Sequence, residues 1–190
     1  AMGNGTTASG NSSTAMGYYT IASGSSSTAM GYRTTAGHYS TAMGYRTTAS
    51  GNSSTAMGYS TTASGNFSTA MGNYTTASRA YSTAMGYLTT ASGNYSTAMG
   101  FNTTASGDYS TAMGRSTTAS DFGSLVIGHY NLSGATVTNS ATEFNTANTA
   151  FVIGNGADGS NQSDAFKVLF NGNTTATGSV TATSFIGDGS

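Results

Sequence analysis

Apolar and polar positions along the first two-thirds of the chain follow a pattern that repeats about every fourteenth residue. The phrase Ser-Thr-Ala-Met-Gly places a methionine at the same point of each repeat, and a second phrase, Thr-Thr-Ala-Ser, keeps the same period. Successive methionines are 14 residues apart, except for Met30 and Met43, which are 13 apart. A fixed period of this length is typical of proteins built from stacked structural repeats.

One repeat unit, starting at Ser54, contains two short runs suited to strands, residues 54–57 and 60–64. Glycine follows each run, at Gly58 and at Gly65 with Asn66, and these residue types supply the positive φ angles of tight corners. The unit has no 3.6-residue apolar period that would indicate a helix. Fourteen residues provide two strands and two turns, so the sequence predicts an all-β fold, a parallel β-roll of about nine coils.

Side-chain size assigns the faces of this roll. Ala56 and Ala63 fit a narrow interior with Ser54 beside them, and strand alternation then directs Met57 outward. A long methionine stripe is rarely left exposed on a soluble monomer, so we expect it to be the interface of a symmetric oligomer. The alternative is that methionine fills the interior of a monomeric rod. The predicted interface residues are Met16, Met30, Met43, Met57, Met71, Met85, Met99, Met113, Ile127 and Ile153.

The repeats have the form Ser-x-Ala-(Ile/Met)-Gly followed by x-x-(Thr/Ser)-x-Ala-x-Gly. They resemble the head repeats of trimeric autotransporter adhesins, the YadA-like or Hep/Hag group, over residues 1 to about 130. The resemblance implies a left-handed parallel β-roll, assembled as an intertwined or side-by-side homotrimer. It also implies attachment to a host, matrix or glycan ligand from the outer membrane at the cell surface. The chain departs from that family by carrying methionine where Ile or Val is commoner, although Ile127 and Ile153 have the commoner form.

Two columns of aromatic residues accompany the repeat at its corners. One follows the glycine of the first phrase, and the other lies four residues before methionine. Their simpler interpretation is that they cover the ends of each coil, and their functional interpretation is a ladder that faces a ligand, because tyrosine combines an apolar ring with a polar tip. The candidate ladder residues are Tyr39, Tyr81, Tyr95 and Tyr109.

The pattern changes after residue 130, so we divide the chain into a β-roll head of residues 1–130 and a segment of residues 131–190. Twelve extra residues between Ile127 and Ile153 indicate an insertion or a capping coil. The stretches 164–173 and 179–185 read as strands joined near an Asn-Gly turn, which suggests a β-rich, stalk-like segment. Residues 164–190 also resemble segments of phage tail fibres, so a fibre on a virion is an alternative function.

Charge is scarce and limits the range of partners. Charged residues make up 6% of the chain and the net charge is −1, which gives no electrostatic footprint for nucleic acid. The arginines, Arg33, Arg46, Arg79 and Arg115, are too scattered in the sequence to predict a basic patch. The chain has no cysteine and no apolar stretch of about 18 residues, so we expect no thiolate site and no membrane contact.

No set of residues indicates catalysis or a cofactor. His38 and His129 lie far apart in the chain, and acidic residues are few. The glycine-rich loop with Asp158 and Asp164 offers oxygen ligands for Ca²⁺, but it matches no known calcium loop, and an ordinary turn is the preferred interpretation. Recurrent pairs such as Thr61 and Thr62 leave an ice-binding solenoid as a further alternative. The sequence therefore predicts a non-enzymatic fibrous protein.

Overall fold

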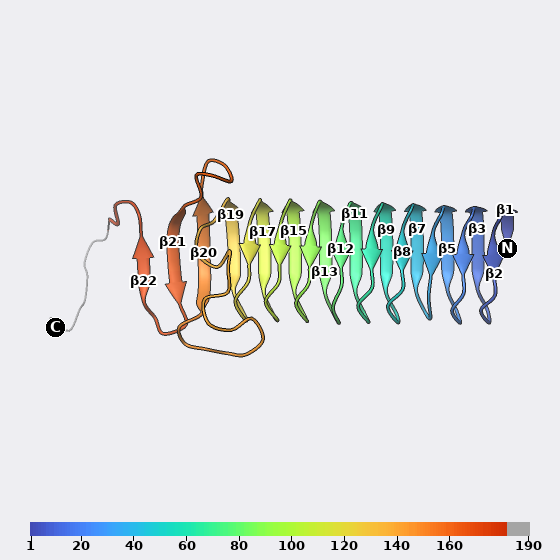
Figure 1. Ribbon diagram of the computed structural model, residues 1–190, viewed down its shortest axis with the longest axis horizontal. Helices are drawn as coiled ribbons and strands as arrows, with labels where there is room; N and C mark the ends of the chain where they lie inside the picture. Colours follow the sequence, from blue (N-terminus) through green and yellow to red (C-terminus); the bar gives the residue numbers. More distant parts are fainter. Residues whose placement is uncertain (182–190) are drawn as a thin grey trace.

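The computed structural model describes residues 1–181, and the chain in it winds into a straight rod of stacked coils (Figure 1). Each coil adds one long strand to a 13-stranded sheet, and most coils also add one short strand to a 9-stranded sheet. No helix occurs among the described residues, and so none that could span a membrane. The prediction of an all-β parallel roll with 14-residue coils is confirmed.

The strands of the long sheet are β1 (Met2–Asn4), β3 (Thr14–Tyr18), β5 (Thr28–Tyr32), β7 (Thr41–Tyr45), β9 (Thr55–Tyr59), β11 (Thr69–Asn73), β13 (Thr83–Tyr87), β15 (Thr97–Phe101), β17 (Thr111–Arg115), β19 (Leu125–His129), β20 (Thr149–Asn155), β21 (Asp164–Leu169) and β22 (Thr174–Ala176). Those of the short sheet are β2 (Thr7–Ala8), β4 (Ile21–Ala22), β6 (Thr35–Ala36), β8 (Thr48–Ala49), β10 (Thr62–Ala63), β12 (Thr76–Ala77), β14 (Thr90–Ala91), β16 (Thr104–Ala105) and β18 (Thr118–Ala119).

Neighbouring coils pair equivalent residues in register. Met57 of β9, for example, pairs with Met71 of β11, and Thr62 of β10 pairs with Thr76 of β12. The one 13-residue spacing does not disturb this register, since Thr28 of β5 still pairs with Thr41 of β7. The missing residue therefore falls in a corner, and identical side chains stack in columns along the whole roll.

The interior between the two sheets is narrow and filled by small side chains. Alanines of both sheets are fully buried from Ala15 to Ala119, and Ser54 and its equivalents line the same space. The threonine just before each short strand is fully buried as well, from Thr20 to Thr117; in the coil that begins at Ser54 it is Thr61. Two valines, Val126 and Val152, replace alanine at the C-terminal end of the core. The prediction of an alanine interior is confirmed.

The corners differ from the prediction. Gly58 lies inside strand β9 rather than after it, and the left-handed corner residue is Ser60, with a φ of 51°. At the other corner Phe67, and not Gly65 or Asn66, has the positive φ, at 57°. Gly58 does have the predicted positive φ, at 127°, although it lies inside the strand, and a Cβ there would also lie 1.9 Å from the carbonyl oxygen of Gly72 in the next coil. The second strand is consequently shorter than predicted, with two residues in β10.

The short sheet ends at β18, where the inserted loop of residues 131–148 covers its edge (Figure 1). The buried Asn131 side chain substitutes for a further strand, because its amide accepts from the Thr118 N–H at 2.8 Å and donates to the Thr118 carbonyl at 2.9 Å. The buried Asp121 carboxylate accepts from the N–H groups of Thr138 and Thr149, at 2.6 and 2.7 Å. These side chains hold the loop against the open end of the core.

The long sheet continues past the roll as an antiparallel extension. Strand β21 pairs antiparallel with β20 and then with β22 across a turn at residues 170–173. The predicted hairpin therefore exists, but the partner strand is Thr174–Ala176 rather than the stretch 179–185. Residues 179–181 form no strand, and residues 182–185 lie outside the described part of the chain. The division into residues 1–130 and 131–190 stays a prediction.

Candidate functional site

The outer face of the long sheet carries one methionine and one threonine per coil, which we call the methionine face. In strand β9, Thr55 and Met57 point outward on either side of the buried Ala56, and both are half-buried. The same arrangement holds from Met30 to Met113, whereas Met16, near the N-terminal end, is 37% exposed. Each methionine is paired in register with the methionines of the adjacent coils. The prediction that methionine points out of the coil is confirmed, and interface formation stays a prediction.

The methionine face becomes bulkier toward the C-terminal end. Ile127 pairs with Met113 on one side and with Ile153 on the other, so the column passes from methionine to isoleucine without a break. Across the antiparallel junction Ile153 pairs with Phe166, and Phe151 pairs with Val168. The face therefore extends beyond the roll onto the hairpin. The sequence alone did not predict Phe166 and Val168 as part of this face, because their position on it depends on the antiparallel register.

The outer face of the short sheet is polar by comparison. Thr62 faces outward, but Thr61 is fully buried between the sheets, because residues two apart on a strand share a face and Thr61 lies on the same side as Ala63. The ice-binding alternative depended on both threonines of each pair facing outward, and that expectation is therefore wrong. At most one outward threonine per coil remains on this sheet, and β4 has Ile21 at that position.

The second aromatic column forms a continuous stack over five coils. Phe67, Tyr81, Tyr95 and Tyr109 follow one another with centroid distances of 4.7–4.9 Å and nearly parallel rings, and Phe122 ends the stack at 5.2 Å. Ring faces inside the stack are covered by their neighbours, so the ring edges and hydroxyl groups point to solvent. The predicted ladder residue Tyr39 does not join this stack, because Ser53 occupies the intervening position.

The first aromatic column stacks along the N-terminal half of the roll. Tyr18, Tyr32, Tyr45 and Tyr59 follow one another at 4.8–5.2 Å with interplanar angles of 5–10°. The next position of this column is Asn73, and Tyr74 fills the break with edge contacts to Tyr59 and Tyr87. The two aromatic columns therefore lie at the two corners of each coil.

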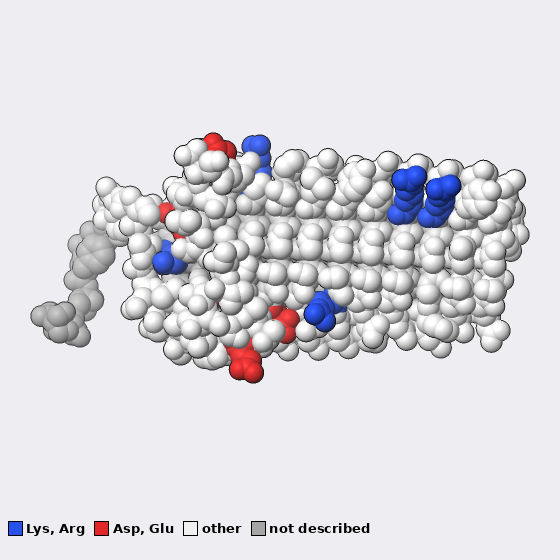
Figure 2. All heavy atoms as spheres, in the orientation of Figure 1, with Lys and Arg blue, Asp and Glu red and all other residues white. Residues whose placement is uncertain are grey.

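The structure brings two of the four arginines together, which the sequence analysis did not predict. Arg33 and Arg46 occupy the same corner on consecutive coils. The backbone N–H of Arg33 donates to the Tyr18 carbonyl, and the backbone N–H of Arg46 donates to the equivalent carbonyl of Tyr32. Two cationic side chains lie side by side on one edge of the rod in Figure 2. The prediction that the arginines are scattered is wrong for this pair. Their separation of 13 residues equals the one shortened repeat, and this was the available signal.

The candidate calcium ligands are occupied by protein donors. The Asp158 carboxylate accepts from the Asn161 side chain and from the Ser160 and Asn161 N–H groups. These hydrogen bonds, the side-chain bond first, hold the pKa of Asp158 below its ordinary value of 3.8. Residues 1–181 contain no group of three or more His, Asp or Glu placed to hold a metal ion. We therefore assign the Asp158 loop as a hydrogen-bonded turn.

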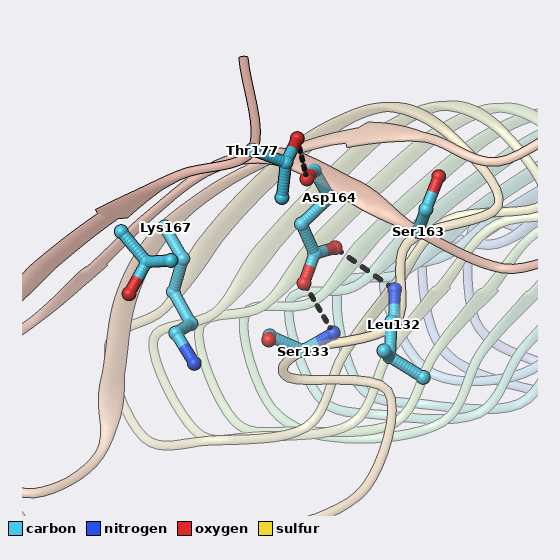
Figure 3. Close-up of a pocket in the computed structure, with 7 residues that line it drawn as sticks. Leu132, Ser133, Ser163, Asp164, Lys167 and Thr177 are labelled. Atoms are coloured by element: carbon cyan, nitrogen blue, oxygen red, sulfur yellow. Dashed lines mark hydrogen bonds between the residues drawn. The ribbon is translucent and has the colours of Figure 1, made fainter.

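Asp164 lies in a pocket of about 240 Å³ between the inserted loop and the hairpin (Figure 3). Its two carboxylate oxygens accept from the N–H groups of Leu132 and Ser133, at 2.9 and 2.8 Å, and its carbonyl accepts from the Thr177 hydroxyl. Asp164 is nearly buried, and its carboxylate satisfies backbone N–H groups of the inserted loop. The pocket is thus a structural junction between the cap and the hairpin.

Comparison with known families matches the chain to a model described as YadA head domain repeat (2 copies). It matches at residues 1–20 and then, in overlapping segments, at residues 22–47, 36–61, 49–75, 63–89, 77–103, 91–117 and 105–131. Comparison with curated proteins gives no match. The matched segments coincide with the coils of the parallel roll and end where the inserted loop begins.

Proposed function

The chain belongs to the YadA head-repeat family, and we propose from this that it forms the head of a homotrimeric, non-enzymatic adhesin displayed at the cell surface. The proposed work of the head is attachment to a cell, matrix or surface ligand. The observation that carries the proposal is the methionine face, which is the apolar side of an otherwise hydroxyl-rich rod.

The proposed trimer places the methionine faces of three chains against one another. An apolar stripe along a whole rod exceeds what soluble monomers usually expose, and a symmetric assembly covers it with an identical stripe. Methionine suits such an interface because its flexible side chain fills irregular gaps. The branched and aromatic residues Ile127, Ile153 and Phe166 extend the same interface to the hairpin.

Sedimentation equilibrium of the whole chain tests this assembly. We expect the mass of three chains for the native protein and a lower mass for the double variant Met57→Lys and Met71→Lys, because paired lysines would be buried without partners. The matched control is Thr62→Lys with Thr76→Lys, which places the same charges in the corresponding coils on the outer face of the short sheet. The mass of a single chain for the native protein would refute the trimer. A methionine variant that stays assembled would exclude this face as the interface.

We propose the stacked aromatic column as an attachment surface on the outside of the trimer. Its exposed edges and hydroxyl groups combine apolar and polar contact, as in other tyrosine-rich binding surfaces. Tyr81→Ser with Tyr95→Ser should reduce attachment to cells or matrix, and the coil tolerates serine there because Ser53 occupies the same position. Tyr87→Asn in the first column, several coils away from Arg33 and Arg46, is the control, since Asn73 occupies the equivalent position natively. Unchanged attachment by the double variant would exclude the column.

A further inference from the structure

The edge of the roll at strands β5 and β7 carries two arginines one coil apart. Arg33 and Arg46 have φ angles of 52° and 53°, so both leave the corner in the same left-handed conformation and project in the same direction. Both side chains are exposed. Their guanidinium carbons lie 5.7 and 5.5 Å from the ring centroids of Tyr32 and Tyr45, and these two rings stack at 4.8 Å. The two guanidinium groups are therefore positioned by a rigid aromatic base.

No acidic residue among residues 1–181 neutralises this pair. The acidic residues that the structure describes all follow residue 107, so the nearest one in the sequence, Asp108, belongs to a coil four repeats further on. Four coils correspond to about 19 Å at a strand spacing of about 4.8 Å, which is more than twice the Debye length of about 8 Å at physiological ionic strength. Figure 2 likewise shows the acidic side chains of this face in the other half of the rod.

Like charges on adjacent coils repel each other, and the rest of this corner column avoids them. The equivalent corner positions in the neighbouring coils are Tyr19 and Ser60, which are uncharged. In a chain with five basic residues in all, placing two of them together without a counter-charge is unfavourable unless an anion binds there. The local arrangement thus points to an anionic ligand.

The residues around the pair indicate what carries the anion. Exposed tyrosines continue the column on both sides, with Tyr18 at 41% and Tyr59 at 40% exposure. Phenol hydroxyls and ring edges suit the hydroxyl-rich, partly apolar surface of a sugar. Two guanidinium groups about 4.8 Å apart can share the three terminal oxygens of one sulfate ester, whereas a carboxylate matches a single guanidinium fork.

We propose that Arg33 and Arg46, flanked by the tyrosines of the first column, bind the sulfate groups of a sulfated polysaccharide. The inference adds a second contact surface, at the corner opposite the stacked column proposed above, and names its ligand class; it rests on the proposed attachment function for its biological use. Both arginines belong to one chain, so binding and trimer assembly can fail independently. Sedimentation equilibrium on the same samples separates the two outcomes.

The test measures binding of the whole chain to heparin and dextran sulfate at about 50 mM salt, with neutral dextran and hyaluronan as comparison polymers. We expect binding to the two sulfated polymers that weakens as salt rises. Arg33→Asn with Arg46→Asn should lower the affinity about tenfold or more, because both charged forks are lost. Asparagine is suited to this corner, since Asn102 occupies the equivalent position at φ 54°.

The matched control is Arg79→Asn with Arg115→Asn, which removes the same charge from arginines on separate coils. We expect less than about a twofold change, because screening leaves distant exposed charges little influence. An equal loss in both double variants would overturn the proposal, since net charge alone would then explain binding. Absence of binding by the native chain would overturn it too. Equal binding to hyaluronan would overturn the assignment to sulfate, and stronger binding to phosphatidylserine vesicles would overturn the assignment to a polysaccharide.

Discussion

The buried threonine hydroxyls of the roll interior offer a sharp test of its packing. The Oγ1 atoms of eight equivalent threonines have no hydrogen-bond partner, at Thr20, Thr34, Thr47, Thr61, Thr75, Thr89, Thr103 and Thr117. Each of these residues is fully buried. Valine has nearly the same shape and places a methyl group where threonine has its hydroxyl. Replacing threonine by valine here should therefore stabilise the protein.

The expected gain follows from the cost of burying an unpaired polar group, which is about 1–3 kcal/mol. The triple variant Thr47→Val, Thr75→Val and Thr103→Val changes every second coil, so its sites are about 9.6 Å apart and should contribute additively. The lower limit of about 1 kcal/mol per site gives about 3 kcal/mol per chain. For a chain of this length that corresponds to a rise of about 6–12 °C in Tm.

Thermal unfolding followed by circular dichroism measures this rise. The matched control is Thr48→Val, Thr76→Val and Thr104→Val, which introduces the same change on the outer face of the short sheet, where the side chains are half-buried. We expect the control to change Tm by at most about 3–6 °C, because surface substitutions usually stay within about 0.5 kcal/mol each, or about 1.5 kcal/mol for three. An interior variant with an unchanged or lowered Tm would show that the hydroxyls have partners and that the reasoning is wrong.

Three further predictions concern the coil contacts, the cap and the Asp158 turn. Gly72→Ala should lower the free energy of unfolding by about 4 kcal/mol or more, since its Cβ would lie 2.0 Å from the Gly86 oxygen at a φ of 126°. Urea unfolding measures this loss, and the control is Gly159→Ala, where no atom lies within 4 Å of the added Cβ. Asp121→Asn should cost about 2 kcal/mol and speed amide exchange in residues 131–148, because an amide has one acceptor oxygen where the carboxylate has two; unchanged exchange would contradict this role. The pKa of Asp158, measured by NMR titration, should lie below 3.8. The stability that its carboxylate adds is then complete above pH 3.8 and is lost as the pH falls through the lower folded-state pKa, and an unshifted titration would contradict it.

The repeat itself determined most of the fold. A 14-residue period with small residues at alternate strand positions leaves space for two strands and an alanine core, and this identified the roll, the outward methionine and the columns of identical residues. Alternation has a period of two, so it specifies the face of each residue once the strand is recognised. The same rule applied from Ala63 would have placed Thr61 inside, although its hydroxyl argued for the surface.

Other features were decided only by the tertiary structure. Corner geometry depends on contacts between coils, so Gly58 proved necessary for close approach to Gly72 and a large residue, Phe67, took the left-handed corner instead. The cap depends on side chains such as Asn131 that pair with backbone far along the chain. Stacking also turned arginines 13 residues apart into neighbours. A repeat sequence therefore specifies the shape of one coil, because that shape depends on local alternation and side-chain size. The surfaces of the rod depend on which residues the winding brings side by side, and a separation of one repeat along the chain reveals this only once the repeat is known to form one coil.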